Sequence, residues 1–305
     1  NDNYYEYLPS EHTKNLETVV KIIKKIPPNT KSLFVMGGGI TLDIGGFIAG
    51  LLHLPVSYVP TTLLAAVDAA IGGKTGVNFM PYGKNQIGLF YEAHSFQFVP
   101  EYLDTLPQEE KLCGVVEALK HSYLFGEFET DKIILDKIIL NTASHEELAQ
   151  IVNKNIQYKT QIVNLDPQEK NGIRASLNFG HTFAHVLEAL VELEYIEKIP
   201  HGIAVAHGIL FLMDLELINK NNIYAYTKEL ITNYPILLKK RPTEELIRKL
   251  LSQDKKNNHD KICTLSLPEY GIFSFNINAK KVTKEFPIEE LSDKILQQLL
   301  STTSM

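Results

Sequence analysis

Four side chains that can bind anions or metal ions occur close together in the second half of this sequence. Arg174, Asn178, His181 and His185 follow one another at steps of four, three and four residues. In one continuous helix, those steps would align a guanidinium, an amide and two imidazoles along one face. A single histidine in such a position is more often structural, but four such groups together favour a binding surface.

Further candidates for metal binding lie on either side of this segment. Glu117 and Lys120 are three residues apart in an expected helix, where the pair alone is typical of a surface salt bridge. His201 begins another expected helix. Two or three histidines with one carboxylate form a site suited to zinc. The spacing does not choose the ligands, because His181 and His185 could both bind one ion.

Backbone features that favour a phosphate-bearing ligand gather near the N-terminus. The apolar run at 33–36 predicts a buried parallel strand, and three glycines follow it directly. The apolar spacing of 40–53 then predicts a helix. Glycine lets the backbone approach a ligand closely, and the free N–H groups of a helix N-terminus attract anions. This order of elements therefore predicts an anion site.

Later junctions repeat this arrangement. A second predicted strand, 56–59, ends just before Thr61 and Thr62, and further glycine turns carry Lys74 and Lys84. The glycine spacing matches neither the dinucleotide fingerprint nor the P-loop, and one such turn alone is more often a plain connection. Together, the turns favour a phosphate-bearing ligand at the carboxyl ends of the strands.

Length and composition are typical of a globular protein with two domains. The 305 residues are 44% apolar and 22% charged, and the net charge of −6 indicates no nucleic-acid-binding surface. The apolar stretch 33–54 contains Asp43 and several glycines, which favours a buried αβ unit over a membrane span. Cys113 and Cys263 are too few for a disulfide framework, and the acidic N-terminus is unlike a signal peptide. We therefore expect a cytoplasmic protein without nucleic-acid or membrane partners.

The pattern changes near residue 106, where glycines become scarcer and long amphipathic stretches begin. We expect an α/β domain over 1–105 and a mainly helical domain over 106–305, with a few short β segments around 262–275. Ser144 and Glu147 form a capping-box pattern that predicts a helix start.

Several motifs together resemble the 3-dehydroquinate synthase family of sugar-phosphate cyclases. They are GGKTGVN at 72–78, LNFGHTFAH at 177–185 and HGIAVAHG at 201–208. The resemblance covers nearly the whole chain. It implies an α/β N-terminal Rossmann-like NAD domain, apparently without the family's first strands, followed by a mainly α-helical C-terminal domain that binds metal and substrate.

The resemblance implies a bound NAD. Glu11 and Lys14 would hold its adenosine ribose, and Asp43 would contact the nicotinamide ribose or amide. The other implied cofactor contacts are Gly38, Gly39, Ile40, Thr41, Leu42, Thr61, Thr62, Asp68, Lys74, Lys84, Tyr102, Leu103, Asp104 and Thr105.

The resemblance also selects the metal ligands, which are Glu117, His181 and His201 around Zn²⁺ or Co²⁺. It assigns His185 to the substrate phosphate instead. Arg174 would bind the substrate carboxylate. The other implied substrate contacts are Asp68, Lys74, Lys120, Lys159, Asn178 and one lysine of the pair Lys255 and Lys256.

The implied reaction converts 3-deoxy-D-arabino-heptulosonate 7-phosphate to 3-dehydroquinate and phosphate. It uses transient oxidation by NAD, phosphate elimination, re-reduction and aldol closure, and the expected protein partner is a second copy of the chain. Two departures from the family pattern are His53 in a segment that lacks the family's arginine, and Ile203 where the family has a glutamate. The alternatives are another sugar-phosphate cyclase, a polyol or alcohol dehydrogenase of the same fold, and a low-activity or non-catalytic paralogue.

Overall fold

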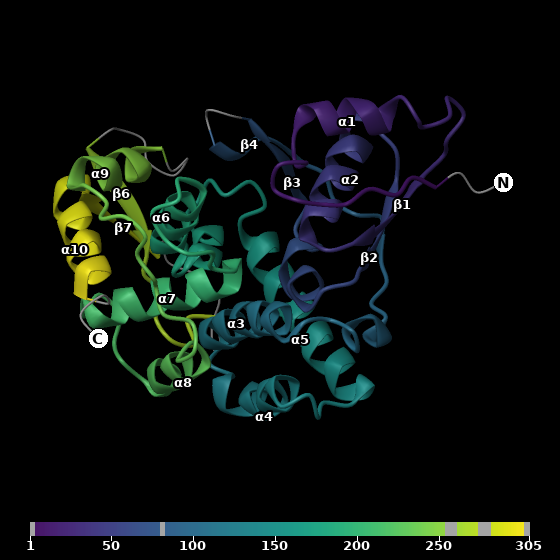
Figure 1. Cartoon of the computed structure of the whole chain (residues 1–305). Helices are drawn as coiled ribbons and strands as arrows, with labels where there is room; N and C mark the ends of the chain where they lie inside the picture. The colour runs from purple at the N-terminus through teal and green to yellow at the C-terminus, as the bar shows by residue number, and fades with distance from the viewer. Residues whose placement is uncertain (1–3, 80–82, 254–260, 274–281, 302–305) are drawn as a thin grey trace. The chain divides into compact units, whose positions relative to one another are not determined.

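The computed structural model describes residues 4–79, 83–253, 261–273 and 282–301 (Figure 1). The chain divides into two compact units, one of Asn1–Gly114 with Asn141–Gln161 and one of Val115–Leu140 with Ile162–Met305. The sequence-based boundary near residue 106 does not include this return of the chain to the first unit.

The first unit is an α/β arrangement around a small parallel sheet. Strands β1, β2 and β5 lie side by side in that order, with Leu33 opposite Val56 and Ser57 opposite Ser95. Strands β3 and β4 form a separate antiparallel hairpin. The elements are α1 (Leu16–Ile23), β1 (Leu33–Gly37), α2 (Gly39–Leu52), β2 (Val56–Pro60), the π-helix η1 (Ala65–Ala69), β3 (Lys74–Phe79), β4 (Gly83–Phe90), β5 (Ser95–Phe96), the 3₁₀-helix η2 (Pro100–Leu103) and most of α5 (His145–Leu165).

Helix α2 lies directly on the strands because glycines form its contact face. A Cβ atom on Gly46 would stand only 2.0 Å from the hydroxyl of Tyr58 on β2. A Cβ on Gly45 would stand 2.6 Å from Val35 on β1. This close packing fixes the N-terminus of α2 at the carboxyl end of β1, where the anion site is predicted.

Strand β1 differs from the prediction of a fully buried strand. Phe34 is 64% exposed and Met36 is 48% exposed, whereas Val35 packs toward α2. Among the described residues, β1 pairs only with β2. Alternate side chains therefore point away from the core, as expected for a sheet covered on one face.

The second unit is mainly helical, with one antiparallel hairpin formed by β6 and β7. Its elements are the later part of α3 (Gln108–Phe125), α4 (Phe128–Ile139), the 3₁₀-helix η3 (Arg174–Asn178), α6 (His181–Glu192), α7 (His201–Asp214), α8 (Asn222–Leu230), α9 (Glu244–Ser252), β6 (Ile262–Ser266), β7 (Thr283–Pro287) and α10 (Ile288–Ser301). The predicted fold class, an α/β part followed by a mainly helical part, is confirmed.

Local helix signals in the sequence are confirmed in detail. The backbone N–H of Ser144 donates to the Glu147 carboxylate at 2.9 Å, and the N–H of Glu147 donates to Ser144 Oγ at 3.2 Å. This reciprocal pair is the predicted capping box, and it starts α5. Strand β6 lies in the predicted β region, whereas β7 begins at Thr283, beyond that region.

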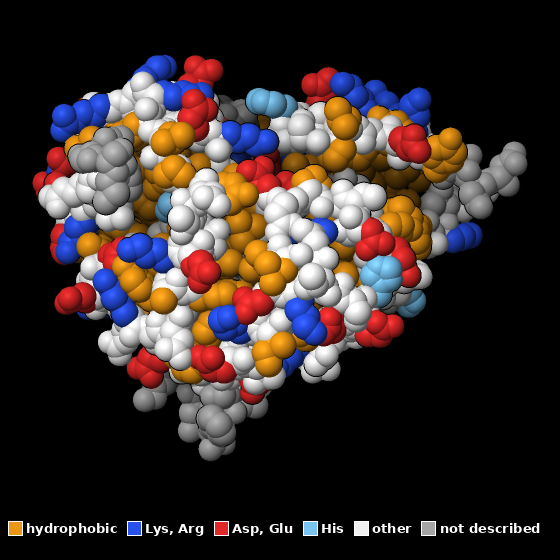
Figure 2. Space-filling model, turned by 60° about the horizontal axis from the view of Figure 1, so that its bottom comes forward, with side chains coloured by type: hydrophobic (Ala, Val, Ile, Leu, Met, Phe, Trp, Pro, Cys, Tyr) orange, Lys and Arg blue, Asp and Glu red, His pale blue; other side chains and the backbone are white. Residues whose placement is uncertain are grey.

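Within the described part of the chain, the helices lack the length and apolar character needed to cross a membrane. On the face that Figure 2 shows, Lys and Arg side chains are interspersed with Asp and Glu side chains.

Candidate functional site

Three helices of the second unit bring a carboxylate and two imidazoles together. Glu117 comes from α3, and His181 and His201 are the first residues of α6 and α7. One ligand atom from each of these residues lies within 4.8 Å of the other two. The sequence alone left two histidine pairs open, and the structure groups His181 with His201.

The distances between these atoms suit a divalent ion. Glu117 Oε1 lies 3.7 Å from His181 Nε2 and 3.9 Å from His201 Nε2. Ligand atoms around tetrahedral zinc lie roughly 3.3 Å apart, because each bond is about 2.1 Å. Glu117 is fully buried, and Oε1 has no hydrogen-bond donor among the described residues. A buried carboxylate oxygen without a donor is costly, so these residues fit a bound cation.

The remaining polar atoms of the group are held by neighbours. Lys120, which is 1% exposed, donates to Glu117 Oε2, so this pair is buried, although its spacing alone is typical of a surface salt bridge. His181 Nδ1 donates to the backbone carbonyl of Phe179 at 3.1 Å. His201 Nδ1 lies 3.2 Å from Glu188 Oε1. Each imidazole therefore keeps Nε2 directed at Glu117.

Electrostatics favour a positive charge at this place. Burial lowers the pKa of His201, but the carboxylates of Glu188 and Glu117 outweigh burial and raise that pKa to about 9. Without an ion, His201 is therefore protonated at neutral pH. An ion that binds there must displace a proton, so its affinity should rise with pH.

The closeness of His181 and His201 depends on two glycines. Gly180 precedes His181 with φ of 79°, and its carbonyl oxygen would stand 1.9 Å from a Cβ on Gly208 of α7. A side chain at either position would separate α6 from α7. The glycines therefore set how closely the two histidine-bearing helix starts approach.

We expect Gly208→Ala to destabilise the chain by about 2–3 kcal/mol, because the added methyl group overpacks a backbone contact. It should also weaken Zn²⁺ binding about tenfold, since about 1.4 kcal/mol of lost ligand geometry has that effect. Chemical denaturation and chelator competition measure the two effects. Gly39→Ala is the stability control, because its Cβ would lie an ordinary 3.6 Å from Ala69. Equal stability of both variants would contradict the packing argument.

A buried aspartate organises the loop before η3. Asp166 is 1% exposed and accepts backbone N–H groups from four residues of the loop, at 2.8–3.2 Å. Arg174, also buried, donates through Nη1 to the carbonyl of Pro167 at 2.8 Å. Glu169 accepts from the Asn178 amide at 3.1 Å. The loop thus fixes two of the predicted substrate-binding side chains.

The possibility of one continuous helix from residue 174 to residue 185 is wrong. The 3₁₀-helix η3 ends at Asn178, Phe179 is extended, and Gly180 is left-handed before α6 begins. Arg174 and Asn178 therefore do not share a helix face with the two histidines. His185 does lie on α6 and is exposed, with its ring centroid 5.8 Å from that of His181.

The first unit gathers several residues that were predicted to contact a nucleotide. Lys14 Nζ lies 2.5 Å from Asp43 Oδ2, although the two residues were expected at opposite ends of NAD. Burial raises the pKa of Asp43, and Lys14 offsets part of that rise. Glu11 accepts from the Asn78 amide at 2.9 Å. The Lys14–Asp43 ion pair brings these two predicted cofactor contacts together.

A second ion pair in this unit joins η1 to α5. Lys159 Nζ lies 2.8 Å from Asp68 Oδ1 and donates to the Asp68 carbonyl at 2.5 Å. Asp68 stands on a π-helical turn, an irregularity that often occurs at functional sites. The sequence pattern predicts Lys159 in the second domain, whereas the structure assigns its helix mostly to the first unit.

The N-terminus of α2 has the features of an anion site. Gly38 is its N-cap, and no side chain caps the helix. Thr61 donates its backbone N–H to the Gly37 carbonyl. Thr62 Oγ1 accepts the backbone N–H of Ala65, the first residue of η1, at 3.1 Å. The predicted contacts of this region, which are Gly38, Gly39, Ile40, Thr41 and Leu42, form the start of α2, although the Leu42 side chain is buried in the core.

The remaining predicted nucleotide contacts are more scattered. Lys74 and Lys84 lie near opposite ends of the β3–β4 hairpin, where their backbone positions are roughly 13–17 Å apart by strand rise. Leu103 is 2% exposed and packs in the core. Asp104 lies 2.9 Å from His145. Tyr102 is partly exposed and Thr105 is exposed. Lys255 and Lys256, one of which is a predicted substrate contact, lie outside the described residues.

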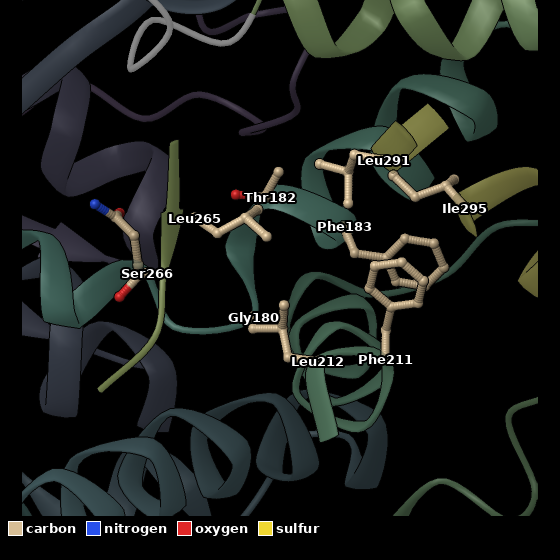
Figure 3. A pocket seen from close by; sticks show the side chains of 10 residues that line it. Gly180, Thr182, Phe183, Phe211, Leu212, Leu265, Ser266, Leu291 and Ile295 are labelled. Atoms are coloured by element: carbon tan, nitrogen blue, oxygen red, sulfur yellow. The ribbon is translucent and has the colours of Figure 1, made fainter. Parts of the chain in front are cut away.

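A small hollow, partly open to solvent, lies beside the histidine-bearing turn (Figure 3). Phe183 and Phe211 stack on one side of it, with ring centroids 4.6 Å apart. Asn178 and Gly180, which flank the start of α6, also line it, but none of the three candidate metal ligands does. The hollow is mostly apolar and is distinct from the carboxylate–imidazole group.

Sequence analysis missed four residues of these sites. Glu188, Asp166, Glu169 and Asn78 each hold a predicted site residue through a hydrogen bond. Glu188 had a usable signal, because it lies seven residues after His181 and so shares its helix face. The other three act across turns or between elements and had no local pattern.

Solved structures share this fold, which is that of the sugar-phosphate cyclases. A 2-deoxy-scyllo-inosose synthase, solved with carbaglucose-6-phosphate, NAD⁺ and Co²⁺, matches with a TM-score of 0.75 at 20% identity, covering 95% of this chain and 82% of that one. Family models described as 3-dehydroquinate synthase N-terminal and C-terminal match residues 5–113 and 114–257. The chain therefore belongs to the 3-dehydroquinate synthase family.

Two curated relatives show how much of a family member the chain spans. The 3-dehydroquinate synthase of Campylobacter hominis is 34% identical over 93% of this chain and 82% of its own length. The bifunctional 3-dehydroquinate synthase/phosphatase of Fusobacterium nucleatum subsp. nucleatum is also 34% identical, over 97% of this chain. The chain spans only 45% of that longer protein.

Proposed function

We propose that this chain converts 3-deoxy-D-arabino-heptulosonate 7-phosphate to 3-dehydroquinate and phosphate. The observation that carries the proposal is the buried Glu117 Oε1 that faces two imidazole nitrogens at 3.7 and 3.9 Å, in a member of the 3-dehydroquinate synthase family. The reaction belongs to the carbon–oxygen lyases, because phosphate is eliminated and the NAD is regenerated in each turnover.

Glu117, His181 and His201 would hold Zn²⁺ or Co²⁺. The ion, when bound, supplies Lewis-acid polarisation of substrate hydroxyl oxygens. Lys120 occupies Glu117 Oε2 and thereby leaves only Oε1 directed at the imidazoles. Because Lys120 carries a positive charge next to the carboxylate, it also offsets the cost of burying Glu117.

Residues of the first unit would bind NAD. The cofactor supplies the hydride acceptor and the hydride donor. The uncapped N-terminus of α2 would bind its pyrophosphate, because free N–H groups and the helix dipole both attract anions. Lys14 and Asp43 would contact one ribose together, and Glu11 would be held in place by Asn78.

Cationic and polar side chains would fix the substrate. Arg174 would bind the carboxylate, for which its planar guanidinium is suited. Asn178, His185 and Lys74 would contact the phosphate, together with one lysine of the pair Lys255 and Lys256. Lys159 would bind substrate hydroxyl or carboxylate oxygens, with Asp68 beside it.

We further propose a cytoplasmic homodimer, as the family resemblance implies. His53, in the segment where the family has an arginine, is an exposed left-handed residue at the end of α2. A histidine lacks the permanent charge and fork of arginine. We therefore expect weaker phosphate affinity than a chain with arginine there would have.

Release of inorganic phosphate from the heptulosonate substrate tests the proposal. The Zn²⁺-loaded chain with NAD should release phosphate and accumulate no NADH, and chelator should stop the release. Release from glucose 6-phosphate or sedoheptulose 7-phosphate, but not from the heptulosonate, would replace the proposal with another cyclase activity. Net NADH formation with a polyol would indicate a dehydrogenase. No reaction with any of these would favour a non-catalytic paralogue.

A further inference from the structure

We propose that Glu188 is the positioning residue that fixes the His201 imidazole for metal binding, an inference that rests on the proposed metal site. Glu188 Oε1 lies 3.2 Å from His201 Nδ1. Glu188 is seven residues after His181 on α6, so both side chains project from the same face of that helix. Helix α6 thus supplies one candidate ligand directly and supports a second on α7.

The contact determines which nitrogen of His201 is available. An imidazole has two ring nitrogens, and a carboxylate at Nδ1 holds the proton there. Nε2, 3.9 Å from Glu117 Oε1, is then the ring nitrogen left to bind an ion. A carboxylate partner also makes the imidazole a stronger ligand than a carbonyl partner does.

The two histidines differ in this respect. His181 Nδ1 is held by the backbone carbonyl of Phe179, which no side-chain substitution removes. His201 begins α7, whose first turn contains no acidic residue, and Ile203 in that turn is buried and aliphatic. The carboxylate for His201 therefore comes from the neighbouring helix. The Glu188 side chain is 16% exposed, so the contact is largely shielded from water.

Metal affinity and the spectrum of bound Co²⁺ test this role. We expect Glu188→Ala to raise the dissociation constant for Zn²⁺ by about 10–100-fold, the usual effect of losing a residue that supports a metal-bound histidine. Glu188→Gln keeps a hydrogen-bond acceptor of the same size, so it should recover part of that loss. The absorption spectrum of bound Co²⁺ should change in the alanine variant, because the imidazole is no longer fixed.

Glu192→Gln is the matched control. It removes the same charge from an exposed position one turn further along α6 and should leave both readouts unchanged. A folded Glu188→Ala variant with the parent's Zn²⁺ affinity and Co²⁺ spectrum would overturn the inference, as would equal losses in the Glu188→Gln and Glu192→Gln variants. Failure of the parent chain to bind either ion would instead overturn the proposed metal site itself.

Discussion

Replacing His181 with alanine should leave the chain unable to retain a divalent ion. A structural zinc site contributes roughly 12 kcal/mol, so losing one of three protein ligands costs about 4 kcal/mol, or about a thousandfold in affinity. Phosphate release should fall by at least a similar factor. Elemental analysis after dialysis against metal-free buffer measures the retained ion, and added Zn²⁺ should restore little activity.

His185→Ala provides the matched comparison, because it removes an imidazole one turn along the same helix. His185 is exposed, and the group formed by Glu117, His181 and His201 does not include it. The variant should therefore retain the ion and lose turnover through weaker phosphate binding. If both variants were equally empty of metal, His185 would have to be a ligand as well.

Asp166→Ala should disorganise the loop before η3, the helix that Arg174 begins. The substitution removes the acceptor for four backbone N–H groups, which must then hydrogen-bond to water instead. We expect a loss of about 3 kcal/mol in unfolding free energy and a Tm lower by about 6–10 °C. The kcat/KM for phosphate release should fall at least about a hundredfold, because Arg174 loses its fixed position.

The control for this variant is Asp293→Ala, on the exposed side of α10. Asp293 accepts from the Gln297 side chain at 2.7 Å, and its loss should change stability by no more than about 0.5 kcal/mol. If Asp166→Ala matched this control in Tm and kept the parent's kcat/KM, the loop would not depend on Asp166.

The loss of stability at acidic pH gives an independent measure of what Asp166 contributes to the free energy of unfolding. Burial pushes its pKa upward, but the backbone N–H groups outweigh burial, so the pKa is lower in the folded chain. Its contribution is therefore complete above the unfolded pKa of about 3.9 and is lost as pH falls through the folded value. Asp166→Asn should be less stable near neutral pH and should lose less stability on acidification.

Much of the local structure follows from short-range patterns. The capping box at Ser144, the glycine-led start of α2 and the helix that holds Glu117 were all predicted, because each depends on residues within one or two turns. The family motifs named the candidate ligands in the same way. Such features need only local hydrogen bonds and local periodicity, and those are visible in one sequence.

Contacts between distant residues decided the rest. The spacing that aligned Arg174 with His181 assumed one helix, but Gly180 adopts a left-handed conformation and packs against Gly208. Periodicity also could not show that Lys120 and Glu117 are buried together, since burial depends on which other helices cover α3.

The sequence by itself determined which residue types are available for metal, phosphate and carboxylate binding. Only the tertiary structure decided that His181 and His201 share one group with Glu117 that leaves out His185, and that Glu188 and Asp166 hold the neighbouring site residues. The physical reason is that these choices depend on how closely separate helices and loops approach. Buried carboxylates and contacts at glycines set those distances, and neither follows from the local periodicity of the sequence.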